Sequence, residues 1–115
     1  MTYRVVAARV PVEALATFLE DAIPSEELLS YRPPVSRGLG AELWRGVHAG
    51  STVRPRVSSW TDSRSEAEAW TRGPGGQVVH RYVDACDIVA VVLHEGGVTE
   101  FVVVNPQDDT AQPLA

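Results

Sequence analysis

The sequence predicts a single α+β domain, and three observations lead to this prediction. Apolar residues recur at helical spacing near the start of the chain, over residues 11–22. Later segments are short, rich in β-branched residues and bounded by glycine or proline, which is typical of strands. The length of 115 residues suits one domain rather than two. We therefore expect one domain over residues 1–106 and a flexible tail over residues 107–115.

The first third of the chain predicts one strand and two helical segments. Residues 2–10 are rich in β-branched and small side chains and predict a short first strand. Pro11 suits the first turn of a helix, where its missing N–H costs nothing, so a helix is expected over residues 11–22. Ser25 is expected to cap one further helical turn. Residues 31–41 are rich in proline and glycine and predict a loop.

The rest of the chain predicts five strands and one helix. The strands are expected at residues 42–48, 56–61, 77–83, 87–94 and 98–105. Ser63 and Glu66 have the spacing of a capping box, which predicts a helix between the second and third of these strands. The segment 87–94 is apolar on both faces and is expected at the centre of a sheet. The two glycines after Glu95 predict a tight hairpin between the last two strands.

Composition and charge exclude several classes of protein. Hydrophobic residues make up 44% of the chain and charged residues 22%, as in a globular rather than a disordered protein. Ten Lys and Arg against 15 Asp and Glu give a net charge of −5, which argues against nucleic-acid binding by bulk electrostatics. No apolar run approaches the length of a membrane span, and the N-terminus lacks a signal-peptide core. A single cysteine, Cys86, excludes an intramolecular disulfide and suits a reducing compartment, so a cytoplasmic protein is expected.

The first polar segment that interrupts a predicted strand contains Arg45 and Gly46. The planar guanidinium of Arg45 suits a phosphate or a carboxylate, which it can bind through two parallel hydrogen bonds. Gly46 would allow a ligand to approach the backbone closely. Taken alone, the segment favours a simpler interpretation, in which Arg45 lies on an edge strand and its charged group reaches solvent.

The second and third polar segments contain hydroxyl and carboxyl groups. Ser59 and Thr61 share one face of a predicted strand and could bind a sugar or support a carboxylate, while Trp60 offers a flat surface for an aromatic ring. The simpler alternative is a solvated hydroxyl face with Trp60 in the core. Glu100 begins the last strand, and it either extends from the hairpin into water or enters a cleft.

The order of these segments resembles the mono-ADP-ribosyltransferase family of the Arg-Ser-Glu type, which includes bacterial toxins and phage enzymes. The resemblance depends on LWRG at 43–46, on SWT followed by DSRSEAEAW at 59–70, and on TEFVVVNP at 99–106. It implies a split β-sheet core with a short N-terminal helical region. It also implies an NAD-dependent enzyme of the glycosyltransferase class, which cleaves the nicotinamide–ribose bond and passes ADP-ribose to an acceptor, or to water as an NAD glycohydrolase.

The resemblance assigns a role to five residues of the first two motifs. Arg45 would hold the phosphates and ribose of NAD, and the backbone of Gly46 would bond the nicotinamide amide. Ser59 would position the site. Thr61 stands where the family has a last serine, and Trp60 lies between them at a cofactor-binding position.

Glu100 matches the catalytic glutamate of the family. Its carboxylate would bind a ribose hydroxyl and stabilise the positive charge that develops on the sugar as nicotinamide leaves. NAD would be a co-substrate, and no metal is expected. The three histidines show no ligand spacing and are expected to be structural or on the surface: His48, His80 and His94.

The acceptor implied by the resemblance is a host protein, inside a bacterial cell or a bacterial host. Arginine-modifying members carry a second acidic residue two positions before the glutamate, where this chain has Val98. The hairpin loop before Glu100 is also short, so an unusual acceptor, a small one or water stays open.

Other functions remain open from the sequence. One is a non-catalytic module of the same fold that binds a nucleotide or a host protein. Another is a structural protein in which the three motifs coincide by chance. Nucleic acid is not an expected partner because the net charge is negative. A transferase that uses a nucleic acid as acceptor stays open, because four arginines could form a local basic patch: Arg54, Arg56, Arg64 and Arg72.

Overall fold

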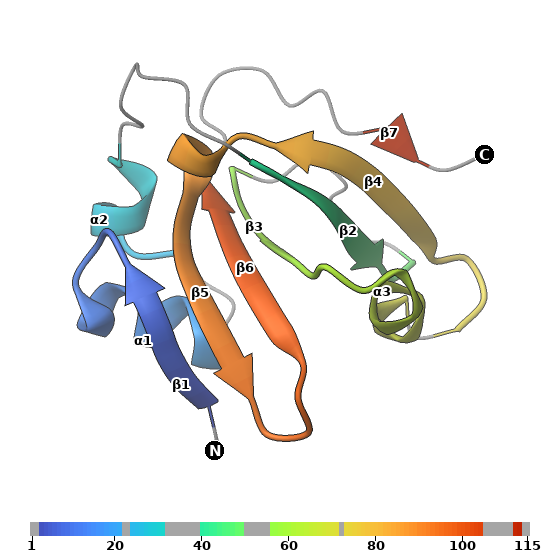
Figure 1. Ribbon diagram of the computed structural model, residues 1–115, viewed down its shortest axis with the longest axis horizontal. Coiled ribbons are helices and arrows are strands. Elements are labelled where there is room, and N and C mark those ends of the chain that lie inside the picture. The colour runs from blue at the N-terminus through green and yellow to red at the C-terminus, as the bar shows by residue number, and fades with distance from the viewer. Residues whose placement is uncertain are drawn as a thin grey trace.

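Two antiparallel sheets and three α-helices make up the part of the chain that the computed structural model describes, residues 3–21, 24–31, 40–49, 56–71, 73–104 and 112–113 (Figure 1). The predicted α+β class is confirmed. The elements in chain order are β1 (Tyr3–Ala8), α1 (Val12–Asp21), α2 (Glu26–Leu29), β2 (Ala41–Val47), β3 (Val57–Trp60), α3 (Arg64–Trp70), β4 (Gln77–Val83), the short 3-10 helix η1 (Ala85–Asp87), β5 (Ile88–His94), β6 (Thr99–Val104) and β7 (Gln112–Pro113).

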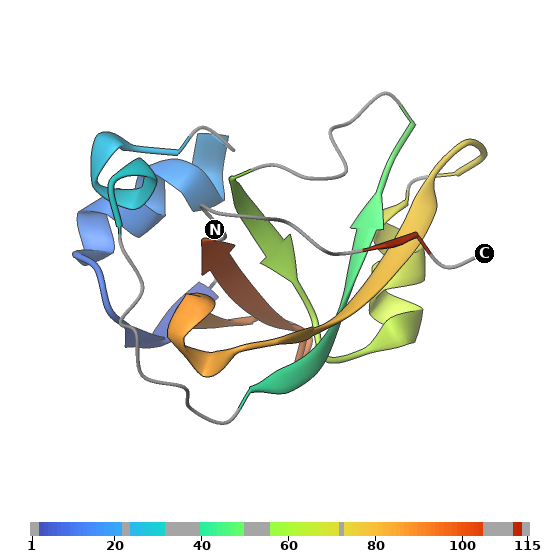
Figure 2. The ribbon, with the colours of Figure 1, turned by 90° about the horizontal axis from the view of Figure 1, so that it is seen from above.

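The strands form a four-stranded sheet in the order β1-β5-β6-β3 and a three-stranded sheet in the order β2-β4-β7. An antiparallel bridge joins the edge strand β2 to the residue after β3. In this bridge, Trp44 N donates to Thr61 O and Thr61 N donates to Trp44 O, each at 2.8 Å. Figure 2 shows β2 and β3 diverging from this junction. The bridge therefore makes β3 the link between the two sheets.

Each face of the four-stranded sheet packs against other elements of the fold. On one face, α1 and α2 cover a core that includes Leu15, Leu28 and Val92, each 0% exposed. On the other face, residues of β3 and β6 pack against β2 and β4 to form a second core between the sheets: Leu43, Trp60, Val79, Val83 and Val103. The alternation of side chains along each strand sends neighbouring residues into different cores.

The local patterns of the sequence place the helices and the hairpin. Ser25 Oγ accepts a hydrogen bond from Leu28 N at 3.3 Å, and Ser63 Oγ accepts one from Glu66 N at 3.3 Å, so both predicted caps are confirmed. The hairpin between β5 and β6 is also confirmed. Its glycines, Gly96 and Gly97, have φ angles of 94° and 88°, which other residues adopt only with strain.

One prediction is incomplete, and another concerns residues that the structure mostly does not describe. The predicted flexible tail contains β7, which pairs with β4 through Pro113 opposite Val79 and Gln112 opposite His80. An extended segment can pair there because an edge strand presents unpaired backbone groups. Most of the predicted loop at 31–41 lies outside the described residues.

Among the helices that are described, none has the length and apolar character needed to cross a membrane.

Candidate functional site

The three motifs singled out in the sequence lie on strands that are neighbours in space. Glu100 is on β6, and Ser59 is on β3, which pairs directly with β6. Arg45 is on β2, next to the residue that bridges to Thr61. The strand that carries Ser59 therefore lies between the strands that carry Glu100 and Arg45, although the motifs are far apart in the sequence.

Glu100 is buried, with 9% of its surface exposed, and side chains approach both of its carboxyl oxygens. Ser59 Oγ donates a hydrogen bond to Oε2. His94 Nε2 lies 2.6 Å from Oε1, which is a close hydrogen bond. A buried carboxyl group is costly unless it has such partners, so the two contacts explain how Glu100 is tolerated at this position. The interpretation in which Glu100 extends from the hairpin into water is wrong.

The strand register explains why these side chains meet. Glu100 lies opposite Val92 on β5, and Ser59 lies opposite Val102 on β6. Since side chains two residues apart share a face, His94 and Ser59 are each diagonal neighbours of Glu100 on the same face of the sheet. Diagonal neighbours are within reach of long side chains, which is the contact observed here.

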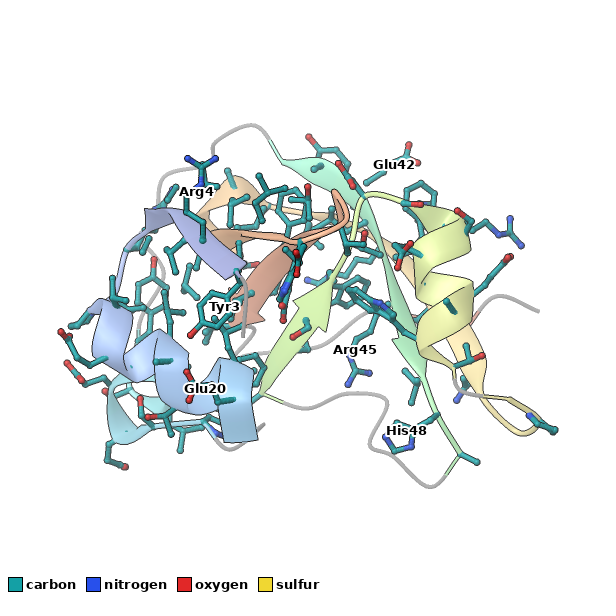
Figure 3. The ribbon with its side chains drawn as sticks, turned by 90° about the horizontal axis from the view of Figure 1, so that it is seen from below. Tyr3, Arg4, Glu20, Glu42, Arg45 and His48 are labelled. Carbon is teal, nitrogen blue, oxygen red and sulfur yellow. The ribbon has the colours of Figure 1, made fainter. Side chains whose placement is uncertain are left out.

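A further contact extends this arrangement to β1. Tyr3 lies opposite His94, with the two ring centroids 6.0 Å apart and the rings tilted by 52°. The Tyr3 hydroxyl donates to Glu20 Oε2 on α1 at 3.2 Å (Figure 3). Partial burial, followed by the hydrogen bond to Glu20 and its negative charge, raises the pKa of Tyr3, so its hydroxyl keeps its proton. We call Tyr3, His94, Glu100 and Ser59 the polar row, with one residue from each strand of the four-stranded sheet.

Arg45 is half-buried on the face of β2 that it shares with Leu43 and Val47. These two residues are buried, and Leu43 belongs to the core between the sheets. Figure 3 shows the Arg45 side chain leaving β2 on the side away from α3. The guanidinium therefore lies on the side of β2 that faces the four-stranded sheet.

Gly46 faces the opposite way, toward α3. A Cβ atom at this position would lie 2.0 Å from Ala67 O and 2.7 Å from the Cβ of Trp70. Close packing of α3 against β2 therefore requires a glycine at position 46. The reason expected from the sequence was the close approach of a ligand. The backbone N–H and C=O of Gly46 point the same way as those of Trp44, away from β4, because these groups alternate along a strand.

Trp60 and Thr61 have structural roles. Trp60 is 2% exposed in the core between the sheets, and its indole Nε1 donates to Ser58 Oγ at 2.7 Å. It presents no ring face to a ligand, contrary to the cofactor-binding role expected from the sequence, because its large apolar surface is more stable in the core. Thr61 is 0% exposed, and its Oγ1 accepts from Ser63 N at 3.2 Å in the turn that starts α3.

His94 is the residue of this site that sequence reasoning missed. It was expected to be structural or exposed, yet it contacts Glu100 directly. The predicted hairpin could have revealed this contact, since a tight turn after Glu95 places positions 94 and 100 diagonally on one face of the sheet. The other histidines lie elsewhere. His80 stacks on Trp44 with ring centroids 4.7 Å apart, and the His48 side chain is exposed.

Cys86 lies in η1, outside the polar row. Partial burial, followed by the negative charges of Asp87 and Asp84, raises the pKa of its thiol. A thiol with a raised pKa has little reactive thiolate at neutral pH, so the thiol of Cys86 is not activated as a nucleophile.

Comparison with known protein families, curated proteins and solved structures finds no significant match. Within the described residues, no group of three or more His, Cys, Asp and Glu side chains is arranged to hold a metal ion. A functional proposal for this chain must therefore depend on the contacts of the polar row and the position of Arg45.

Proposed function

We propose that the protein cleaves the nicotinamide–ribose bond of NAD and passes the ADP-ribosyl group to an acceptor, as its resemblance to mono-ADP-ribosyltransferases implies. One observation carries this proposal. The hydroxyl of Ser59 on β3 donates a hydrogen bond to the carboxyl group of Glu100 on β6. The residue after β3 bridges to β2, the strand that carries Arg45. The hydroxyl, the carboxyl group and the guanidinium come from three distant segments, and the strands that carry them are neighbours in the order that the resemblance requires.

Glu100 supplies the negative group for the reaction. When nicotinamide leaves, positive charge develops on C1′ and the ring oxygen of the ribose. A fixed carboxylate stabilises this charge better than water does, because its burial lowers the local dielectric and its orientation is already set. The proposed role of Glu100 is therefore to stabilise the transition state and to accept a hydrogen bond from a ribose hydroxyl.

Arg45 supplies the positive group. The dinucleotide carries two phosphates, and a guanidinium can bond each with two parallel N–H groups. The backbone groups of Gly46 point away from β4, and we assign to them the hydrogen bonds to the amide of nicotinamide that the resemblance implies. We therefore place the phosphates near β2 and the reacting ribose near Glu100, with Ser59 between them.

The bonds of the proposed reaction balance as follows. The C1′–N bond breaks, and its electron pair stays with the nicotinamide nitrogen, whose positive charge is lost. A lone pair of the acceptor forms the new bond to C1′, and the acceptor proton is released to a base or to water. With water as acceptor the product is free ADP-ribose. With a protein side chain as acceptor the product is a modified protein.

The residue two positions before Glu100 bears on the choice of acceptor. Val98 is half-buried and has no group that could orient a guanidinium. A neutral hydroxyl or water needs no such partner. We therefore favour water or a hydroxyl group over arginine as the acceptor.

The test is to incubate the protein with NAD and measure released nicotinamide by chromatography. Glu100→Gln keeps the size of the side chain and removes its charge, so nicotinamide release should fall by about 100-fold or more. Glu27→Gln is the matched control, because Glu27 is exposed on α2, and it should keep full activity. Equal activity of Glu100→Gln and the wild type would contradict the proposal.

Calorimetry with NAD distinguishes the second candidate, a non-catalytic module that binds a nucleotide. Binding of NAD with no nicotinamide release by the wild type would support that module and exclude the transferase.

A further inference from the structure

We infer that His94 is a positioning residue, which fixes the carboxyl group of Glu100 from the side opposite Ser59. Ser59 occupies Oε2, and His94 Nε2 lies 2.6 Å from Oε1. The terminal torsion of a glutamate side chain has a broad energy minimum, so burial alone does not fix the plane of the carboxyl group. Two partners on two different oxygens do fix it.

The hairpin places His94 where this contact is possible. His94 is the last residue of β5, and its backbone N donates to Val98 O at 2.8 Å across the turn. Val92, two residues earlier, lies opposite Glu100. His94 and Glu100 are therefore diagonal neighbours, and the turn sets their separation.

Tyr3 supports the imidazole from the other side. Its ring lies 6.0 Å from that of His94, measured between centroids, and its hydroxyl bonds Glu20 on α1. The imidazole thus lies between an aromatic ring on β1 and a carboxyl group on β6. Because the resemblance to known transferases begins only at about residue 42, the first strand adds a part of the site that the motifs do not include.

The exposure of the two side chains suits a positioning role. The side chain of His94 is 30% exposed and that of Glu100 is 12% exposed, so the contact lies at the rim of the core. An ionised carboxylate has about four lone-pair sites, and Ser59 and His94 use two of them. The remaining sites can accept a ribose hydroxyl. His94 therefore acts through Glu100 and not on the substrate.

The catalytic part of this inference rests on the proposed function, and kinetics test it. His94→Leu removes the donor and keeps an apolar side chain. It should lower kcat for nicotinamide release by about 10-fold or more while KM for NAD changes less than about twofold. His94→Gln should recover most of kcat, because its amide nitrogen can donate to the same oxygen. Glu27→Gln, which is exposed on α2, is the control and should keep wild-type kinetics.

A merely structural histidine would give a different result. Its loss would lower the folded fraction of His94→Leu, and the rate for each folded molecule would stay unchanged. Wild-type kcat in His94→Leu, after correction for the folded fraction, would overturn the inference. A kcat for His94→Gln no higher than that of His94→Leu would also overturn it.

A second measurement does not depend on NAD chemistry. In ¹H–¹⁵N spectra of the histidine side chains, the Nε2 signal of His94 should move in Glu100→Gln, while the signals of His80 stay unchanged. Glu27→Gln should move neither. A His94 signal that is the same in the wild type and Glu100→Gln would show that the contact is absent in solution and would overturn the inference. If the signal moves but the wild type releases no nicotinamide, the positioning contact stands and the proposed function fails.

Discussion

Ser59 on β3 donates a hydrogen bond to Glu100 on β6, although 41 positions separate the two residues in the sequence. The antiparallel pairing of β3 with β6 creates this contact, since Ser59 and Glu100 are diagonal neighbours on one face. The hydroxyl of Ser59 thus becomes the partner of a buried carboxyl group on the neighbouring strand.

Ser59→Ala removes the donor that holds Oε2. Because the carboxyl group then keeps the contact with His94 but loses the one that holds Oε2, nicotinamide release should fall by about 10-fold. Ser59→Thr keeps the hydroxyl and suits a strand, so it should retain most of the activity. The comparison is made by chromatography of released nicotinamide. Equal activity of the alanine and threonine variants would show that the hydroxyl has no role.

Arg45→Ala should weaken NAD binding by about 10- to 100-fold, because a hydrogen-bonded charge pair is lost. Arg45→Lys keeps the charge but not the planar fork, and it should give an intermediate dissociation constant by calorimetry. Arg64→Ala is the control, since Arg64 forms an exposed pair with Glu68 on α3. If Arg45→Ala binds NAD as the wild type does, the phosphates lie elsewhere.

Gly46→Ala should lower the free energy of unfolding by about 2–3 kcal/mol, as in other overpacked sites. The added Cβ would lie 2.0 Å from Ala67 O, so α3 must move. Gly96→Ala separates this effect from backbone strain. Gly96 has a φ of 94°, and apart from its chain neighbours no atom of the described residues lies within 4 Å of an added Cβ, so that variant should cost about 1 kcal/mol. Urea denaturation measures both, and a smaller loss for Gly46→Ala than for Gly96→Ala would contradict the packing of α3.

Cys86 should react slowly with iodoacetamide at neutral pH. Burial, and then the charges of Asp87 and Asp84, raise the pKa of the thiol, so the reactive thiolate is scarcer than in a free cysteine at the same pH. The rate should increase as the pH rises toward the raised value. Asp87→Asn removes one negative charge and should speed the reaction at neutral pH. Alkylation followed by mass spectrometry measures the rate, with glutathione as the reference thiol, and a rate equal to that of glutathione would contradict the shift.

Local sequence patterns predicted much of the fold. The caps at Ser25 and Ser63 were found because a hydroxyl bonds backbone groups within one helical turn. The central place of β5 follows from its apolar residues on both faces. In each case the residues that decide the structure are close together in the chain.

Contacts between distant segments were harder to predict. Gly46 is required by α3, which begins 18 residues later, and no pattern around the glycine shows which element will pack on it. β7 pairs with β4 only because the fold leaves that edge open. At the site, Ser59 and Glu100 were predicted through a resemblance. The contact of His94 was not predicted, because it depends on the register of a hairpin.

The bridge between Trp44 and Thr61 belongs to a closed circuit of contacts. Thr61 accepts a hydrogen bond from Ser63, Ser63 caps α3, and α3 packs on Gly46, which follows Trp44 by two residues. The circuit begins and ends within a single stretch of the chain. Arg45 lies within this circuit, and Ser59 precedes its member Thr61 by two residues on β3. A distortion of the circuit would therefore displace both motifs together.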